Sequence, residues 1–434
     1  MFEEETGKYN KVLMAIYIIV LAVSALGDMS SHSMSRMMKS ASLIVIVIGA
    51  AVLLVGGNLN RIKKSWNFIF LYAFVLVGII IWSVFLWILN IESIGFIMRG
   101  TSKFMYQFLV LLIIFAGTYL LGERSIHATF YGLALANAVI MFINIGNYGI
   151  VDSVNSVMEM FQGAEAQRGF ARAMELHDIT FAFGFFVIYF IFFAKHNRER
   201  IIDIAIAAFF FILGWKRIAL AALPATIAIG VVMGWMKPKT RKIFMQAIAW
   251  GFVIFSFLYI VATRTGIFEA VTNYFEIDTM GRNDIYRYIE KYYNISLGFL
   301  GYGFEYTTVI LQQAMNTNPD ASMKVLALHN NILTVYIELG FVGFWAWLLY
   351  TWVFQLRWML KHWGEKVALL FFLSELYIFI TYMTDNTLYY YYTSMTLRLM
   401  PMAYSFHVTD DSEIKQWPWV KEQKPSRLYE YLTS

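Results

Sequence analysis

Residues 67–89 read NFIFLYAFVLVGIIIWSVFLWIL, and none of these side chains carries a charge. A helix needs about 20 such residues to cross the hydrocarbon core of a bilayer. Similar apolar runs recur along the chain and predict about twelve membrane-spanning helices. The predicted runs are 12–27, 41–57, 67–89, 104–121, 128–146, 179–194, 201–213, 218–236, 244–262, 332–356, 367–383 and 387–406.

The composition favours an all-α polytopic membrane protein. Hydrophobic residues make up 59% of the 434 positions and charged residues only 15%, against roughly 25% charged in an ordinary soluble domain. These values exclude a soluble globular enzyme. Since about twelve crossings leave no room for a large separate domain, residues 1–434 are predicted to form a single integral membrane domain. The chain has no cysteine, which excludes disulfides, thiolate metal sites and cysteine nucleophiles.

The distribution of basic residues predicts the orientation. More than half of the 34 Lys and Arg residues fall on the side of the N-terminus, and cytoplasmic loops carry such an excess. Both ends of the chain are then cytoplasmic, including a tail over 407–434. The outer face receives two long polar segments, 147–177 between the fifth and sixth helices and 263–331 between the ninth and tenth. The net charge of +5 comes with no nucleic-acid motif, so no nucleic-acid partner is expected.

The later outer segment is predicted to be partly helical. Within it, GRNDIYRYIEKYY (281–293) places Ile285 and Ile289 on one helical stripe and Arg282 with Tyr286 on an adjacent stripe, as in an amphipathic surface helix. The following NISLGFLGYGFEY (294–306) supplies glycines that permit tight turns or a close backbone approach to a ligand.

This segment ends in LALHNNILTVYIELGFVGF (326–344), where His329 and Asn330 precede a helix at the water boundary. Imidazole groups titrate near neutral pH, so His329 is a candidate for proton transfer. The alternative is an interfacial histidine that only caps the helix. Glu338 lies about 13 Å further along the helix, and a carboxylate at that depth is expected to have a partner.

Basic side chains also stand in other outer positions. Arg217 follows Trp215 and Lys216 in a short hairpin, where it is either a snorkelling anchor or an anion clamp for a lipid phosphate. The earlier outer segment carries a mixed charged group, for most of which solvated charge is the simpler account. Its members are Glu165, Arg168, Arg172, Glu175, His177 and Asp178.

Two further features lie in the last two predicted spans. Glu375 and Arg398 are expected to neutralise each other as a structural pair. The tyrosines at 389–392 either stack on sugar rings or form an aromatic belt at headgroup level, and the belt is the simpler explanation.

The phrase HNNILTVYIELGFVGF (329–344) resembles the signature of the O-antigen polymerase and O-antigen ligase superfamily. The matching residues are His329, Asn330, Leu333, Glu338, Gly340 and Gly343. Upstream, residues 281–306 resemble the family's Gly-Arg opening of its outer loop and its GYG-like turn at 301–303. WKRIALAAL (215–223) resembles its Ser-Arg-Gly helix start, of which only Arg217 is kept. Both Arg282 and Arg287 also match an arginine-to-glycine spacing to Gly298.

The resemblance implies a type-C glycosyltransferase of the bacterial cytoplasmic membrane, acting on the outer face without metal, cofactor or nucleotide-sugar. Its donor is a glycan on polyprenyl diphosphate, typically undecaprenyl diphosphate, and an acceptor hydroxyl displaces the lipid diphosphate. His329 is then the expected base, while Arg217 and Arg282 balance the leaving group. The expected substrate-binding residues are Asn330, Arg287, Tyr302, Arg168, Arg172 and Glu338.

Three functions remain open from the sequence. The first is polymerisation of lipid-linked repeat units into a surface polysaccharide, such as O-antigen, capsule or exopolysaccharide. The second is ligation of the finished chain to a lipid A core or another acceptor. The third is a flippase or transporter of lipid-linked glycan, which predicts polar residues spread along several spans. Expected partners are the donor, a glycan or lipid-linked acceptor, membrane lipids, and assembly proteins such as a flippase and a chain-length regulator.

Overall fold

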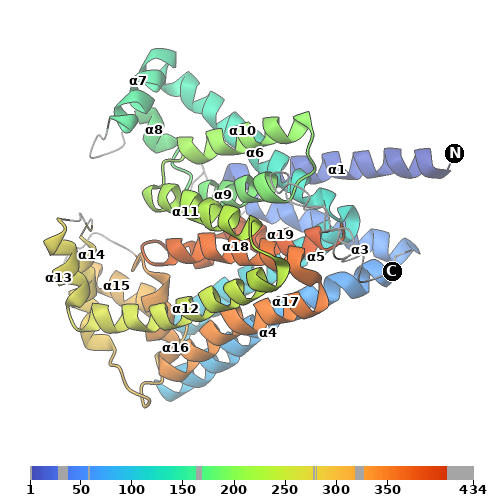
Figure 1. Cartoon of the computed structure of the whole chain (residues 1–434). Helices are drawn as coiled ribbons and strands as arrows, with labels where there is room; N and C mark the ends of the chain where they lie inside the picture. The colour runs from blue at the N-terminus through green and yellow to red at the C-terminus, as the bar shows by residue number, and fades with distance from the viewer. Residues whose placement is uncertain are drawn as a thin grey trace, which may run out of the picture.

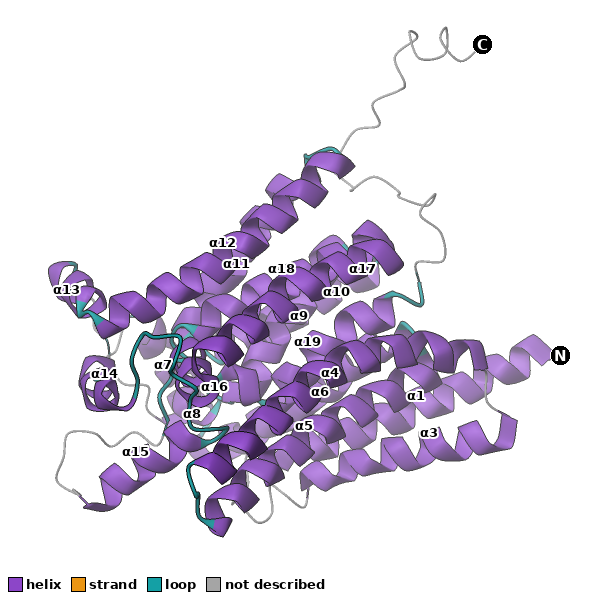
Figure 2. Cartoon of the chain, turned by 90° about the horizontal axis from the view of Figure 1, so that it is seen from below, coloured by secondary structure: helices purple, strands orange, loops and turns teal. Residues whose placement is uncertain are grey.

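The computed structural model describes residues 2–27, 38–56, 59–162, 169–276, 279, 281–317 and 327–407. Every element in these ranges is a helix (Figure 2). The bounds are α1 (Phe2–Leu26), η2 (Ser40–Ser42), α3 (Leu43–Gly56), α4 (Leu59–Leu89), α5 (Ile94–Leu121), α6 (Arg124–Tyr148), α7 (Ile150–Phe161), α8 (Gly169–Ala173), α9 (His177–Phe192), α10 (Arg198–Leu213), α11 (Arg217–Gly234), α12 (Pro238–Arg264), α13 (Ile267–Tyr274), α14 (Arg282–Ile289), η3 (Glu290–Tyr292), α15 (Tyr306–Thr317), α16 (Asn331–Leu348), η4 (Leu349–Phe354), α17 (Gln355–His362), α18 (Gly364–Tyr382), η5 (Thr387–Tyr389) and α19 (Tyr391–Tyr404).

The helices confirm an all-α membrane protein. Within the described ranges, six are long and apolar enough to cross a bilayer, and three shorter ones are also apolar. The six are Ile62–Leu89, Ile94–Leu121, Arg124–Tyr148, Arg217–Gly234, Pro238–Arg264 and Asn331–His362. All twelve predicted runs coincide with helices, although the last one begins with the short turn η5 before α19. Twelve crossings stay a prediction.

The bundle has two different ends. The short helices α7, α8, α13, α14 and α15 gather at the end opposite the start of α1, which we call the loop end (Figures 1 and 2). All five belong to the two long polar segments, and α14 with η3 forms the amphipathic helix predicted over 281–293. At the other end, Arg241 and Glu365 form a buried ion pair. The loop end is therefore where a site made by the polar segments must lie.

A break in α16 ties the glycine-rich turn to the bundle. Gly340 has a φ of 70°, and the helix loses its regular backbone hydrogen bonds there. The turn at 299–303 replaces them, since Gly303 N–H donates to the Glu338 carbonyl at 2.8 Å and Phe341 N–H donates to the Phe299 carbonyl at 2.7 Å. A Cβ on Gly301 would lie 2.4 Å from the Gly340 nitrogen. Gly301 therefore permits a close approach between the turn and the backbone of α16.

Glu375 and Arg398 lie close enough to interact electrostatically, but the hydrogen-bond partner of Arg398 is a different residue. The Arg398 guanidinium on α19 donates to the side-chain oxygen of Gln107 on α5 at 2.9 Å. No ion pair joins it to Glu375 among the described residues. Two similar depths along neighbouring helices do not determine which way the side chains point, and α5 offers a closer acceptor.

Candidate functional site

The segment between α18 and α19 forms the centre of the site. Its far side is anchored by Asp178 at the start of α9, whose carboxylate accepts hydrogen bonds from the backbone N–H groups of Tyr392 at 3.0 Å and Thr393 at 2.8 Å. These are the first residues of α19, where free N–H groups favour an anionic partner. Asp178 thus holds the first turn of α19, which directly follows Tyr390, the residue whose hydroxyl contacts Asp385. The interpretation of Asp178 as solvated charge is wrong, because its side chain is buried.

His329 stands against this segment from the start of α16. Its φ of 50° is left-handed, an uncommon conformation for a residue with a side chain and one that concentrates at functional sites. The Nδ1 atom lies 3.8 Å from Oδ1 of Asp385 and 3.5 Å from the side-chain nitrogen of Asn386. About a third of the imidazole is exposed, whereas the carboxylate is 10% exposed. The imidazole can therefore reach a substrate while a carboxylate stands behind it.

Asp385 is held as an anion. Its Oδ1 atom accepts hydrogen bonds from the Asn386 backbone at 2.7 Å and from the Tyr390 hydroxyl at 3.0 Å. Burial raises the pKa of Asp385, but the contact with His329, the Asn386 N–H and the positive charge of Lys216 outweigh burial and hold that pKa below its ordinary value of 3.8. The carboxylate is consequently ionised at neutral pH.

Arg282 reaches the same segment from the first turn of α14. This helix begins after Gly281, whose φ of 77° is easily adopted by glycine. The guanidinium donates to the Thr384 carbonyl at 3.0 Å. Its Nε–H group is buried and has no acceptor among the described residues. A buried donor without an acceptor is costly, so this group is suited to an incoming anion.

Lys216, the last residue before α11, supplies a second cation. The side chain is almost buried, pairs with Glu175, and lies 3.3 Å from Nε2 of His177. The preceding Trp215 has a left-handed φ of 45°, which turns the chain at this point. By contrast, Arg217 is exposed, and in the described part of the chain no hydrogen bond or ion pair joins it to this cluster. Glu175 is also not simply solvated, because it is committed to Lys216.

Asn330 is fully buried and its side chain is used within the protein. It caps α16 by accepting from the Leu333 backbone at 3.0 Å, and its amide donates to the hydroxyls of Tyr259 and Tyr286, each at 3.1 Å. These tyrosines belong to α12 and α14, so Asn330 ties three elements together beside His329. The geometry gives Asn330 a structural task, that of fixing the backbone on which the imidazole stands.

The other predicted binding residues lie apart from His329. Arg287 lies on another side of α14 than Arg282. It pairs there with Glu269, beside a separate cavity of about 210 Å³. Tyr302 stacks on Tyr306, with ring centres 4.1 Å apart. Arg172, at the end of α8, is exposed. Arg168 lies outside the described residues, as do residues 408–434 of the predicted tail.

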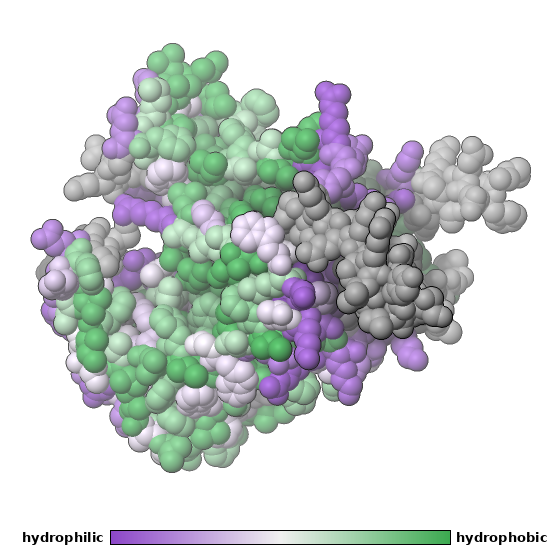
Figure 3. All heavy atoms as spheres, in the orientation of Figure 1, coloured by the Kyte–Doolittle hydropathy of each residue, from purple (hydrophilic) through white to green (hydrophobic). Residues whose placement is uncertain are grey.

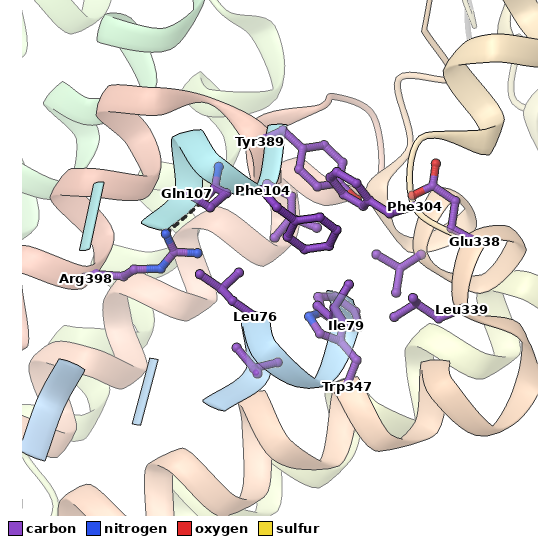
Figure 4. A pocket seen from close by; sticks show the side chains of 13 residues that line it. Leu76, Ile79, Phe104, Gln107, Phe304, Glu338, Leu339, Trp347, Tyr389 and Arg398 are labelled. Atoms are coloured by element: carbon purple, nitrogen blue, oxygen red, sulfur yellow. Dashed lines mark hydrogen bonds between the residues drawn. The ribbon is translucent and has the colours of Figure 1, made fainter. Parts of the chain in front are cut away.

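Glu338 has the partner that its depth predicts. Its carboxylate accepts from the hydroxyl of Thr307 at 2.7 Å and from the backbone N–H of the same residue at 3.3 Å. It faces a cavity of about 740 Å³ at the loop end, whose wall includes Glu175, His177 and Asn386. A smaller cavity of about 60 Å³ lies next to it, with Glu338 at one edge and the Arg398–Gln107 pair at another (Figure 4).

The sequence did not show that four residues of this cluster contact or interact with one another. They are Asp385, Lys216, Glu175 and His177. Asp385 and Lys216 had a signal, because each is a charged residue in a short connection between two apolar runs. No spacing rule joins them, since the cluster combines side chains at or just before the first residues of α9, α11, α14 and α16 with the segment before α19. In the described ranges, no three His, Asp or Glu side chains are grouped as metal ligands.

Comparison with known proteins agrees with the resemblance in the sequence. Residues 202–348 match the family model described as O-Antigen ligase, a stretch that contains Lys216, Arg217, Arg282 and His329. A search of curated proteins found no match. Over residues 202–348, about a third of its length, the chain is therefore similar to the O-antigen ligase family.

Proposed function

We propose that the protein polymerises polyprenyl-diphosphate-linked oligosaccharide units into a cell-surface polysaccharide, on the outer face of the cytoplasmic membrane. The observation that carries this proposal is the approach of the partly exposed His329 imidazole to the buried Asp385 carboxylate, 3.8 Å apart. Two cations, Arg282 and Lys216, stand around the same segment. A base beside its orienting carboxylate and flanked by cations matches the demands of transfer from a diphosphate.

In the proposed reaction, the acceptor hydroxyl oxygen forms a bond with the anomeric carbon of the donor sugar. The bond from that carbon to the diphosphate oxygen breaks, and its electron pair leaves with the polyprenyl diphosphate. The hydroxyl proton passes to His329, and the Asp385 carboxylate stabilises the resulting imidazolium. The imidazole returns to its neutral form by losing this proton to water.

The diphosphate gains negative charge as it leaves, and fixed cations lower the energy of that state. Arg282 presents a buried N–H group that lacks an acceptor, and its planar guanidinium suits phosphate oxygens. We assign the second cation to Lys216, because this side chain points into the cluster. The exposed Arg217 at the start of α11 is left as a contact for lipid headgroups.

Ligation is the second candidate function. The family model that matches residues 202–348 is described as O-Antigen ligase, and the donor chemistry of the two reactions is the same. They differ in the acceptor, which is another lipid-linked unit for a polymerase and a lipid A core or other acceptor for a ligase. The proposed roles of His329, Asp385 and Arg282 hold for either.

The test is an in vitro assay of the purified protein with lipid-linked repeat units. A growing ladder of products from the wild type, absent with His329→Asn, supports polymerisation. A single transfer step to an added core acceptor supports ligation. Movement of the lipid-linked glycan across liposomes without formation of a glycosidic bond would overturn both and favour a flippase.

A further inference from the structure

The helix α7 has three distinct faces. One face packs on the protein through Ser153, Ser156, Val157 and Met160. A second exposed face is apolar, and each of its residues is more than half exposed: Ile150, Val151, Val154, Met158 and Phe161. A third exposed face is polar and consists of Asp152, Asn155 and Glu159. A helix between protein, an apolar phase and water shows this division, because each side chain follows the phase that it meets.

The apolar face continues a surface that already belongs to a predicted span. Helix α6 leads directly into α7 through Gly149, and its last turns expose Phe142 and Ile143. At the other end of α7, Phe161 packs edge-on against Trp215, with ring centres 4.8 Å apart. In the space-filling view, hydrophobic residues make up much of the surface in the upper part of the molecule, where α7 lies (Figure 3). A bilayer that surrounds α6 would therefore also meet α7.

The second polar segment contains a comparable helix. On α13, Ile267, Val271 and Tyr274 lie on one stripe and are all exposed. This helix belongs to a different part of the loop end (Figure 1). A protein partner of ordinary size would cover one of these stripes, whereas a lipid surface around the bundle meets both.

We propose that α7 lies flat in the headgroup region of the outer leaflet, with its apolar face in the acyl boundary. Helix α8 and Glu175 follow α7 in the chain, and Glu175 binds Lys216. Helix α8 also packs on α7, where the Ala171 N–H donates to the Ser156 hydroxyl at 3.0 Å, so the depth of α7 bears on the height of this ion pair relative to the lipid phosphates. The inference concerns membrane placement and does not depend on the chemistry proposed for the site.

The absence of cysteine allows a direct test, because any introduced cysteine is unique. Single variants Val154→Cys and Met158→Cys on the apolar face, with Asn155→Cys and Glu159→Cys as matched polar-face controls, are spin-labelled in the full chain. The protein is reconstituted into phosphatidylethanolamine and phosphatidylglycerol vesicles, and collisions with oxygen and with a water-soluble nickel chelate are measured by electron paramagnetic resonance.

We expect the ratio of oxygen to nickel accessibility to be several-fold higher at positions 154 and 158 than at 155 and 159. Equal ratios with high nickel accessibility at all four positions would show a helix in water and overturn the proposal. Low accessibility to both reagents at 154 and 158, with dipolar broadening between labels, would show a second copy of the chain on this face and would also overturn it.

Discussion

The Nδ1 atom of His329 lies 3.8 Å from Oδ1 of Asp385, where the start of α16 meets the segment between α18 and α19. This relationship supports the proposed role of His329 in proton transfer, and the partner cannot be found from the position of His329 in the sequence. A histidine that only capped a helix would have no need of a buried, ionised carboxylate beside it.

Replacing His329 by asparagine removes the imidazole and keeps a residue that tolerates a left-handed φ. We expect the transfer rate to fall by about 10²-fold or more, the usual contribution of a general base. Binding of the lipid-linked donor, measured by its quenching of intrinsic fluorescence, is expected to change little. A variant that keeps the wild-type rate within a few-fold would contradict the role of His329 as a base.

Lys216 and Arg217 are adjacent cations with opposite exposure, which makes them a matched pair. We expect Lys216→Gln to lower kcat by about 10²-fold, in the range found when one charge-stabilising group is removed, and Lys216→Arg to retain part of the activity. Arg217→Gln is expected to alter mainly KM, because this side chain is exposed. The reverse pattern in steady-state kinetics would reassign the second cation to Arg217.

The ionised Asp385 predicts a specific change in pH dependence. The pKa of Asp385 is held below 3.8, so its charge is complete above that pH and is lost only as the pH falls through the lowered value. Loss of activity through protonation of Asp385 is therefore confined to the acid side, below that value. Asp385→Asn should lower kcat at neutral pH, because the imidazolium formed in the reaction loses its carboxylate partner, and should remove this acid-side loss. Wild-type kcat at neutral pH in Asp385→Asn would separate Asp385 from the base.

The packing of the glycine turn against α16 predicts a stability difference between two glycines. A Cβ at Gly301 meets backbone atoms of α16 within 3 Å, and the residue has a φ of 87°. At Gly298 nothing lies within 4 Å of the Cβ position. We expect Gly301→Ala to cost on the order of 2 kcal/mol or more, seen as a lower thermal unfolding temperature in detergent. Gly298→Ala should be nearly neutral, and equal effects would contradict this packing.

The sequence predicts the helices well because a bilayer imposes one rule on every span. Apolar runs must be long and helical, since backbone groups find no partners in lipid. The amphipathic pattern of 281–293 likewise predicts α14 and η3, because the pattern lies within one continuous segment of the chain. Some helices extend beyond their apolar runs. Helix α12, for example, begins at Pro238 with a mostly basic turn and ends at Arg264, whereas the predicted run is 244–262.

The site is less predictable because its members come from distant segments. His329 and Arg282 are found from sequence through a local motif, but Asp385 and Lys216 join them only when the loop end is assembled. The choice between Lys216 and Arg217 depends on burial, since Lys216 is buried and Arg217 is exposed. The sequence also does not show which way the Arg398 side chain points along its span. It points to Gln107 on α5, to which it donates a hydrogen bond.

The most direct measurement is a single-turnover reaction of the purified protein with a fluorescent lipid-linked repeat unit, followed by release of the free polyprenyl diphosphate. Wild-type protein should form the new glycosidic bond and release the lipid diphosphate in equal amounts. His329→Asn should bind the donor with a similar Kd and release almost none. Release and bond formation at the wild-type rate in His329→Asn would contradict proton transfer to this imidazole as the basis of the reaction.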